Sequence, residues 1–230
     1  GIASFPAFEA GTPATITVNV MDMTGDPAVL YGFIDWNKDG DFEDPNEKFN
    51  VTIPDGTNGN VVMNVNVPED AVINMPLGAR FRLSTDDIAA STPEGPAPNG
   101  EVEDYLVTVV AYDYGDLADN DTPNSFPTNN FNGGEGLGAK HQIIAALRLG
   151  VIEDAETDGQ QSSEATGDDT GDSPDDEDGV VFATPLVPGY SACLKITAHN
   201  ATGANAYLQA WMDFNGNGKF DAGEMLTTGS

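Results

Sequence analysis

The sequence of 230 residues contains one cysteine and only eight lysine and arginine residues. Cys193 therefore cannot form a disulfide within the chain, and its alternating surroundings predict a small buried apolar residue. Against 38 aspartates and glutamates, the scarce positive charge leaves a formal net charge of −30. We expect no nucleic-acid binding, because phosphate binding requires clustered cations. The charge favours cations as partners, and a solvating acidic surface is the alternative interpretation.

The sequence also lacks the apolar run of about 20 residues that a membrane helix needs. Neither histidine belongs to a zinc motif, and no serine stands in a G-x-S-x-G turn. Carboxylate pairs are frequent, but at this acid content some reach glycosidase spacing by chance. We therefore expect neither enzymatic activity nor membrane insertion. The start at Gly1, without methionine or a leader, predicts a processed chain or part of a longer one.

An internal similarity connects the two ends of the sequence. Aligning Asp213 with Asp35 sets an offset of 213 − 35 = 178, and this offset serves residues 179–221 without a gap. Turn glycines, alternating apolar positions and acidic loop residues all keep one register, which chance does not explain. The sequence therefore predicts three regions: a repeat unit at 1–111, an acidic spacer at 112–178, and the first strands of a second, incomplete unit at 179–230.

Short alternating segments between turn residues predict an all-β first unit. Strands are expected at 15–20, 30–36, 60–67, 80–84 and 101–110, and their number favours an antiparallel β-sandwich. In the spacer, glycine, proline, asparagine and aspartate dominate. Its segment GAKHQIIAALRLG predicts one short helix, although the flanking glycines allow a strand equally well.

The segment DFNGNGKFDAGE, residues 213–224, fits the calcium-loop pattern D-x-[DN]-x-[DN]-G-x5-E at every defined position. Gly218 allows the sharp turn, and oxygen ligands are typical of a hard cation. Magnesium fits less well because it requires tight octahedral geometry. The predicted calcium ligands are Asp213, Asn215, Asn217, Lys219 through its carbonyl, Asp221 and Glu224.

A less regular copy of this loop stands in the first unit. Its predicted calcium ligands are Asp35, Asn37, Asp39, Asp41 and Glu47. Position 12 of the pattern is Asn46, so the closing acid Glu47 comes one residue late, and Asp44 is a possible substitute. The alternative is an acidic β-turn without an ion. Both loops follow strands, not helices, which favours a staple between strands over an EF-hand switch.

The spacer ends in an acidic run, residues 164–178, without a single cation. Such a run repels itself and stays disordered unless cations neutralise it. We count Asp168, Asp176 and Asp178 as further candidate calcium ligands.

Two charged strands suggest a structural role for two of the few arginines. Alternation places Arg80 with Arg82 on one strand and Glu101 with Glu103 on another. Cross-strand pairing of these four residues would fix the strand register, at about 0.2–1 kcal/mol per exposed pair. A glutamate turned toward an ion is the rival interpretation.

Three segments follow one another in this sequence: YGFIDWNKDGDF, ARFRLS and GEVEDYLVTV. In these motifs and their order, the chain resembles the GEVED domains of bacterial secreted and cell-surface proteins. YLQAWMDFNGNGKFDAGE matches the first element again. The spacer also resembles the segment that precedes such domains, through the strings DYGD, GAKH, LRLG, EDAETDGQ, GDDTGD and DDEDGVVF. The resemblance implies an extracellular β-sandwich that serves as a spacer or adhesion module.

These features predict a structural, adhesin-like repeat of an extracellular surface protein or filament, stiffened by calcium. Its expected partner is itself, as tandem repeats or as a homopolymer in which residues 179–230 are completed by strand complementation. One alternative is a calcium-dependent carbohydrate-binding module that contacts glycans or other cell surfaces through Tyr31, Trp36, Tyr207 and Trp211. Another is an accessory domain of a secreted protease. N-x-[ST] triplets occur at Asn50, Asn120 and Asn200.

Overall fold

The computed structural model describes residues 1–119, 126–129, 138–167 and 176–226. The chain divides into two compact units, unit 1 from Gly1 to Ala111 and unit 2 from Tyr112 to Ser230. Strands are the main regular elements of both units, so the prediction of an antiparallel all-β fold is confirmed. None of the helices in the described ranges is long and apolar enough to span a membrane.

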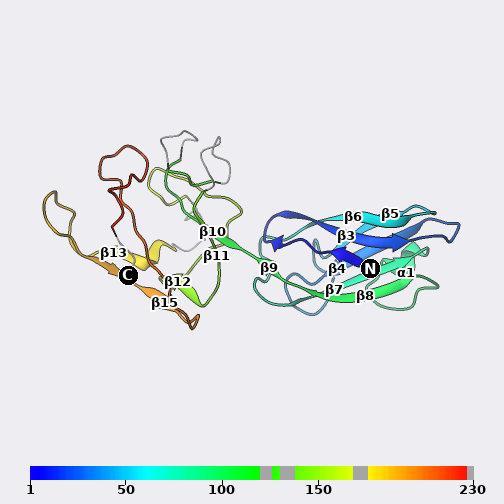
Figure 1. Cartoon of the computed structure of the whole chain (residues 1–230). Coiled ribbons are helices and arrows are strands. Elements are labelled where there is room, and N and C mark those ends of the chain that lie inside the picture. The colour runs from blue at the N-terminus through cyan, green and yellow to red at the C-terminus, as the bar shows by residue number, and fades with distance from the viewer. Residues whose placement is uncertain (120–125, 130–137, 168–175, 227–230) are drawn as a thin grey trace. The chain divides into compact units, whose positions relative to one another are not determined.

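Unit 1 consists mainly of two antiparallel sheets that Figure 1 shows as layers. One sheet has the order β1-β3-β6 and the other β5-β4-β7-β8. The strands are β1 (Ile2–Ser4), β3 (Pro13–Met21), β4 (Ala28–Ile34), β5 (Lys48–Ile53), β6 (Asn58–Asn66), β7 (Leu77–Ser84) and β8 (Glu101–Val107). A short parallel pair joins β2 (Phe8–Glu9) to β9 (Val109–Val110). The sequence did not predict β1, β2 or β5.

The core of unit 1 lies between the sheets, where alternate residues of each strand point inward. Ile16 on β3, Met63 on β6 and Phe81 on β7 are at most 3% exposed. Alternation of this kind buries one face of β3 and leaves Thr15 and Asn19 of the same strand in solvent. The two-layer packing therefore follows directly from the period-two pattern.

Strand β4 differs because it is buried on both faces. Tyr31 and Phe33 form a second apolar cluster with Ala90 of the short helix α1 (Asp87–Ala90). Phe42, from the loop after β4, packs on this cluster. The segments around α1 and Phe42 thus cover the second sheet and bring the β4–β5 loop into contact with the folded core.

The described residues of unit 2 form three two-stranded antiparallel sheets, β10-β11, β12-β15 and β13-β14. The strands are β10 (Tyr112–Tyr114), β11 (Lys140–Gln142), β12 (Leu147–Leu149), β13 (Val180–Phe182), β14 (Leu194–Ile196) and β15 (Ala198–Asn200). A 3-10 turn, η1, spans Glu177–Gly179.

The helix expected in GAKHQIIAALRLG does not form, and this prediction is wrong. The segment holds β11 and β12, and between them Leu147 N–H donates to the Ile144 carbonyl at 3.0 Å. Gly150 ends β12 with φ of +66°, a conformation that favours glycine. The strand alternative is the correct one, because the chain reverses direction within the segment instead of continuing in one.

Residues 180–226 leave many apolar side chains in solvent, including Phe182, Tyr190 and Phe214. The strand expected before the loop at 213–224 is reduced to a bridge between Trp211 and Met225. Cys193 is exposed, so its predicted burial is wrong. In unit 1 the corresponding strand β4 pairs with β5 on one side and with β7 on the other.

Candidate metal-binding loops

The first candidate loop, residues 35–47, connects β4 to β5. The two strands remain paired up to Phe33 and Lys48, and Ile34 N–H donates to the Glu47 carbonyl at 2.9 Å. The loop is therefore the turn of a β-hairpin. An ion held in it would join two neighbouring strands of the second sheet.

Asp35 opens this loop by accepting backbone N–H groups, Oδ1 from Asp39 and Oδ2 from Gly40, both at 3.1 Å. Gly40 has φ of +97°, which permits the sharp turn that the sequence pattern requires. Further along, Asn37 Oδ1 accepts from Asp39 N–H and Asp39 Oδ1 from Asp41 N–H. Side-chain oxygens thus curl the backbone around themselves in successive Asx turns.

Glu47 closes the loop from within the protein, with 1% of its surface exposed. Its Oε1 accepts the Trp36 N–H at 2.9 Å, and its Oε2 accepts the Asp44 N–H at 3.2 Å. Burial raises the pKa of the Glu47 carboxyl; these two hydrogen bonds oppose the rise, and the nearby Asp35 and Asp44 charges add to it. A bound cation would offset the burial of this charge.

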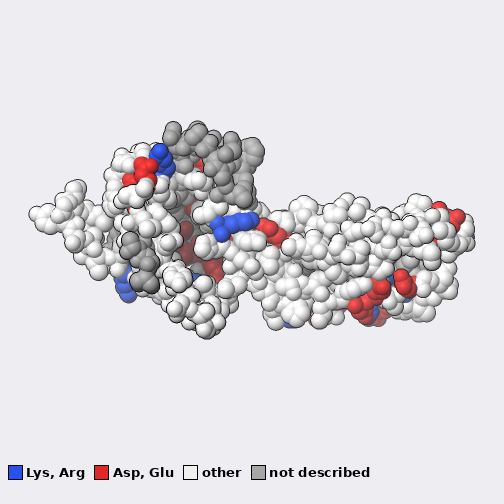
Figure 2. All heavy atoms as spheres, viewed as in Figure 1, with Lys and Arg blue, Asp and Glu red and all other residues white. Residues whose placement is uncertain are grey.

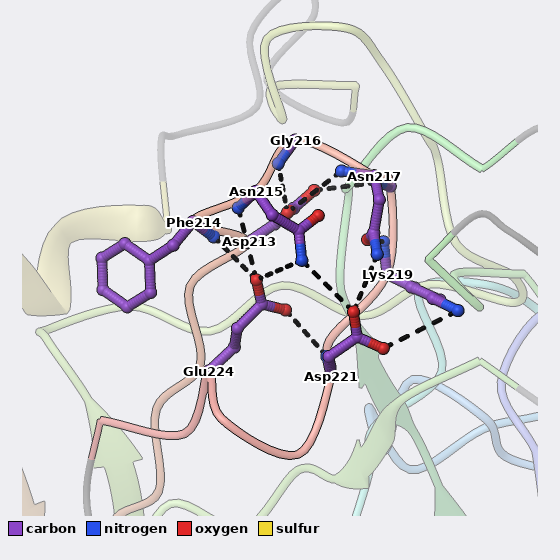
Figure 3. A network of polar contacts seen from close by, with 9 residues as sticks. Asp213, Phe214, Asn215, Gly216, Asn217, Lys219, Asp221 and Glu224 are labelled. Carbon is purple, nitrogen blue, oxygen red and sulfur yellow. Dashed lines mark hydrogen bonds and ion pairs between the residues drawn. The ribbon is translucent and has the colours of Figure 1, made fainter.

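The second candidate loop, residues 213–224, is organised in the same way (Figure 3). Asp213 Oδ1 accepts N–H groups from Gly216 at 2.7 Å and Asn217 at 3.2 Å, and Oδ2 accepts from Gly218 at 2.8 Å. The pKa of Asp213 is lowered, first of all by the Gly218 N–H. The carboxylate therefore stays charged in mildly acidic solution, as a cation ligand must.

Glu224, 5% exposed, closes this second loop. Its Oε1 accepts the Phe214 N–H at 3.0 Å and its Oε2 the Asp221 N–H at 2.8 Å. The Asn215 amide nitrogen lies 3.2 Å from Asp221 Oδ2 and 3.0 Å from Glu224 Oε1, between the two carboxylates (Figure 3). Asn217 Nδ2 donates to the same Asp221 oxygen at 2.8 Å, and this bond is the first cause of the lowered Asp221 pKa.

The two loops share one hydrogen-bond framework despite their different lengths. Glu47 and Glu224 each accept the N–H of the residue after the first aspartate, and the N–H of an aspartate three residues upstream. Asp44 therefore takes the place of Asp221. The first loop has one additional residue, Glu43, which explains why its closing acid comes late in the sequence. From the sequence, Asp44 was only a possible substitute for that acid.

An aromatic pair connects each loop to the segment before it. Phe42 lies with its ring centroid 5.8 Å from Phe33, and Phe220 lies 6.4 Å from Trp211. These pairs are related by the same offset of 178 residues as the loops. Closing either loop around an ion therefore also fixes an aromatic contact.

The loops offer the oxygen ligands that calcium prefers. Asp39, Asp41 and Asp44 are exposed, and they can bring one carboxylate oxygen each within 4.8 Å of one another. In the second loop, the Lys219 ammonium lies 3.7 Å from Asp221 Oδ1 and offsets part of the negative charge. The arrangement can hold a divalent cation, once the asparagine amides present oxygen in place of nitrogen.

The two described spacer acids that the sequence proposes as ligands, Asp176 and Asp178, have different partners. Asp178 accepts the Val151 N–H with both carboxylate oxygens at 3.0 Å. Asp176 instead belongs to a group with Asp113 and Glu156, whose ligand atoms lie within 4.8 Å. The predicted ligand Asp168 and the glycosylation triplet at Asn120 lie outside the described residues.

The sequence did not indicate Asp113 or Glu156 as members of an acidic group. Glu156 is 7% exposed and accepts the Tyr114 N–H at 2.9 Å. A bridge between Tyr112 and Glu156 brings Glu156 next to β10. That contact joins residues more than forty positions apart, so local pattern alone does not reveal it.

The predicted pairing of Arg80 and Arg82 with Glu101 and Glu103 is wrong. Arg80 lies opposite Asp104 and forms a two-pronged pair with it, Nε to Oδ1 and Nη2 to Oδ2, both at 2.7 Å. The register sets even-numbered residues of β7 opposite even-numbered residues of β8. Glu101 and Glu103 therefore lie on the other face, where Glu103 accepts a hydrogen bond from the Tyr105 hydroxyl at 2.8 Å.

Arg82 has no carboxylate opposite it in the sheet, where its cross-strand neighbour is Val102. The side chain is 6% exposed and serves as a backbone anchor. Its guanidinium donates to three carbonyl oxygens of the segment before β8, those of Thr92, Glu94 and Gly95. Arg82 thus orders the long β7–β8 connection by hydrogen bonds to its backbone.

Comparison with known proteins gives one positive result. Residues 29–108 match the family model described as the GEVED domain. No curated protein and no solved structure matches the chain. The match begins within β4 and ends after β8, so it covers the second sheet, the first candidate loop and the Arg80–Asp104 pair. The chain therefore contains a GEVED domain within unit 1.

Proposed function

We propose that the protein is a non-catalytic structural module of an extracellular or cell-surface protein, in which calcium bound to loops 35–47 and 213–224 staples neighbouring segments. The observation that carries this proposal is the shared framework of the two loops. Each gathers carboxylates around one turn and closes it with a buried glutamate. Two separate segments with such a framework indicate a common ligand.

Charge supports a cation as that ligand. The Asn215 amide lies between the carboxylates of Asp221 and Glu224, which would otherwise repel each other. A divalent ion replaces such a weak donor with a full opposite charge. Calcium suits the site better than magnesium, because it accepts six to eight oxygens in flexible geometry.

The proposed consequence is mechanical. In unit 1 the loop residue Trp36 is buried against Phe8, with ring centroids 5.4 Å apart, and its N–H is held by Glu47. An ion that immobilises Glu47 therefore also immobilises an aromatic residue of the core. This coupling would stiffen the sandwich and supports the role of a spacer or adhesion repeat.

Calcium titration calorimetry on the full chain tests the proposal. We expect binding at two or more sites, and loss of one site in Glu224→Gln, which keeps the shape of the side chain but removes its charge. Glu43→Gln serves as the control, because Glu43 is the additional residue of the first loop and its side chain is exposed. No heat of calcium binding in the wild-type chain would contradict the proposal.

A calcium-dependent carbohydrate-binding role is the second candidate, and one observation favours it. Tyr207 and Trp211 are 76% and 43% exposed, in the segment that leads to the second loop. In unit 1, by contrast, Tyr31 and Trp36 are buried and present no stacking surface. A glycan-array signal that disappears with a calcium chelator and in Tyr207→Ala would support this role.

A further inference from the structure

The outermost strand of the first sheet, β6, differs from other strands at the margins of unit 1. Its sequence, NGNVVMNVN, contains no charged residue and no proline. Its pairing with β3 runs from Pro13↔Asn66 to Met21↔Asn58 without a bulge. The outermost strand β8 of the other sheet carries Glu101, Glu103 and Asp104. Charges, prolines and bulges normally protect sheet edges from pairing with other chains, and β6 has none of them.

The hydrogen bonds at the two ends of β6 show which of its backbone groups face solvent. Val67 N–H donates to the Thr12 carbonyl, and Asp22 N–H donates to the Thr57 carbonyl. Odd-numbered residues of this segment therefore point their N–H and C=O groups toward β3. In an antiparallel ladder these directions alternate. The even-numbered residues point their groups to the free edge: Asn58, Asn60, Val62, Asn64 and Asn66.

The sequence of these five even-numbered residues is symmetric: Asn, Asn, Val, Asn, Asn. Asparagines lie symmetrically about Val62, two on each side, and all five side chains are exposed on the outer face. If a second β6 aligns antiparallel with Val62 opposite Val62, Asn60 lies opposite Asn64 of the copy. Each such pair exchanges both backbone hydrogen bonds, because all its groups point across the new edge.

The side chains also suit this register. On the outer face, asparagine meets asparagine, and the Oδ1 atoms of Asn60 and Asn64 already accept from Asn19 and Thr15 of β3. Their amide N–H groups can therefore donate across the pair. On the inner face, the same register places Val61 opposite Met63 of the copy, which extends the apolar layer.

Charge distribution favours the β6 edge over the acidic β8 edge. Two chains of net charge −30 repel each other, so they associate most readily where neither brings acidic groups. Figure 2 shows an uncoloured surface where Figure 1 labels β3 and β6, while acidic side chains appear toward β8 and the end of the unit. We propose that two copies of this chain form a two-fold dimer by antiparallel pairing of β6 with β6, centred on Val62. The dimer does not depend on ion binding.

Sedimentation velocity over a wide concentration range tests the dimer, in 0.5 M NaCl to screen the repulsion. We expect the weight-average mass of the full chain to rise toward twice that of one chain. Val62→Lys places two ammonium groups opposite each other and should abolish the rise. Val102→Lys is the matched control, because Val102 is 57% exposed against 56% for Val62 but lies on β8. It should dimerise as the wild type does.

A second pair of variants separates backbone pairing from side-chain effects. Asn64→Pro removes an N–H group that points to the free edge, where proline is tolerated, and should prevent dimerisation. Asn64→Ala loses the same side chain but keeps the N–H, and should retain most of the association. A thermal melt of each variant checks that the fold persists.

Residue-resolved amide exchange identifies the interface directly. As concentration rises, the amides of the even-numbered residues of β6 should become protected at least tenfold, while those of the odd-numbered residues should not change. A chain that stays monomeric at all concentrations would overturn the proposal. A dimer that persists in both Val62→Lys and Asn64→Pro, or that protects other amides instead, would overturn it as well.

Discussion

At the scale of single residues, the two buried glutamates show how one side chain can organise a loop. Glu47 holds the backbone on both sides of its loop, at Trp36 and at Asp44. Its two hydrogen bonds stabilise the charged form of the carboxyl. Its pKa is nevertheless raised, because burial opposes the charge more strongly. Such a residue gains from a cation, which is why it stands at the centre of the proposed function.

Replacing Glu47 by glutamine tests this dual role. The amide can accept from only one of the two N–H groups and turns its own donors toward the other. We expect the free energy of unfolding in a chelator at pH 7 to fall by about 1–3 kcal/mol, since one buried N–H loses its acceptor. Calcium should then recover less stability than in the wild type. Urea unfolding measures both effects, and Glu43→Gln should change neither.

The Arg80–Asp104 pair predicts a pH dependence. The arginine lowers the pKa of Asp104 first of all through the hydrogen bonds between them. A carboxyl whose folded pKa lies below its unfolded value stabilises the protein above the unfolded pKa, and this stability is lost as the pH falls through the folded pKa. The pair is partly exposed, so solvent screens its contribution.

We expect Asp104→Asn to destabilise the chain slightly at pH 7, and we expect this loss to shrink as the pH falls below the unfolded pKa of the carboxyl, because protons then bind the unfolded state first. Urea unfolding between pH 7 and pH 3 measures the difference. Glu101→Gln is the control, because Glu101 lies on the other face of the same strand. An equal loss at all pH values would show that the pair acts through packing and not through charge.

At the scale of elements, β4 is the strand on which unit 1 depends most. Phe33 is fully buried and contacts Tyr31 on its own strand and Phe42 in the loop. Phe33→Ala should lower the free energy of unfolding by about 3–5 kcal/mol, because it removes a large side chain and leaves a cavity. Leu106→Ala, at a site 73% exposed, should change it by less than about 0.5 kcal/mol. Chemical denaturation of both variants compares them.

The elements that sequence predicts best are those whose pattern is local. Strands β3, β4, β6, β7 and β8 follow from alternation, and the Asp213 loop follows from ligand spacing. The partners of Arg80 and the group around Glu156 depend on register and on contacts between distant segments, which no local pattern encodes. The expected helix near Ile144 failed because apolar spacing suits a helix and a tight strand reversal equally.

At the scale of the whole molecule, the proposed function has to explain the net charge of −30. Many of the acidic residues lie in the loops and the spacer. In the two candidate loops, several carboxylates accept hydrogen bonds from backbone N–H groups. Repeat organisation and a surface location remain predictions, supported by the GEVED domain and by the common framework of the two loops. If calcium neutralises the loops, stability should depend on it throughout the chain.

The most direct test of this account is thermal unfolding of the full chain with and without millimolar calcium, with magnesium as control. An ion that binds only the folded state adds about 2.7 kcal/mol per site at a hundred times its dissociation constant. We predict a rise of the unfolding midpoint by many degrees in calcium and a much smaller rise in magnesium. An unchanged midpoint, or an equal rise with both ions, would contradict the claim that the two loops are calcium staples.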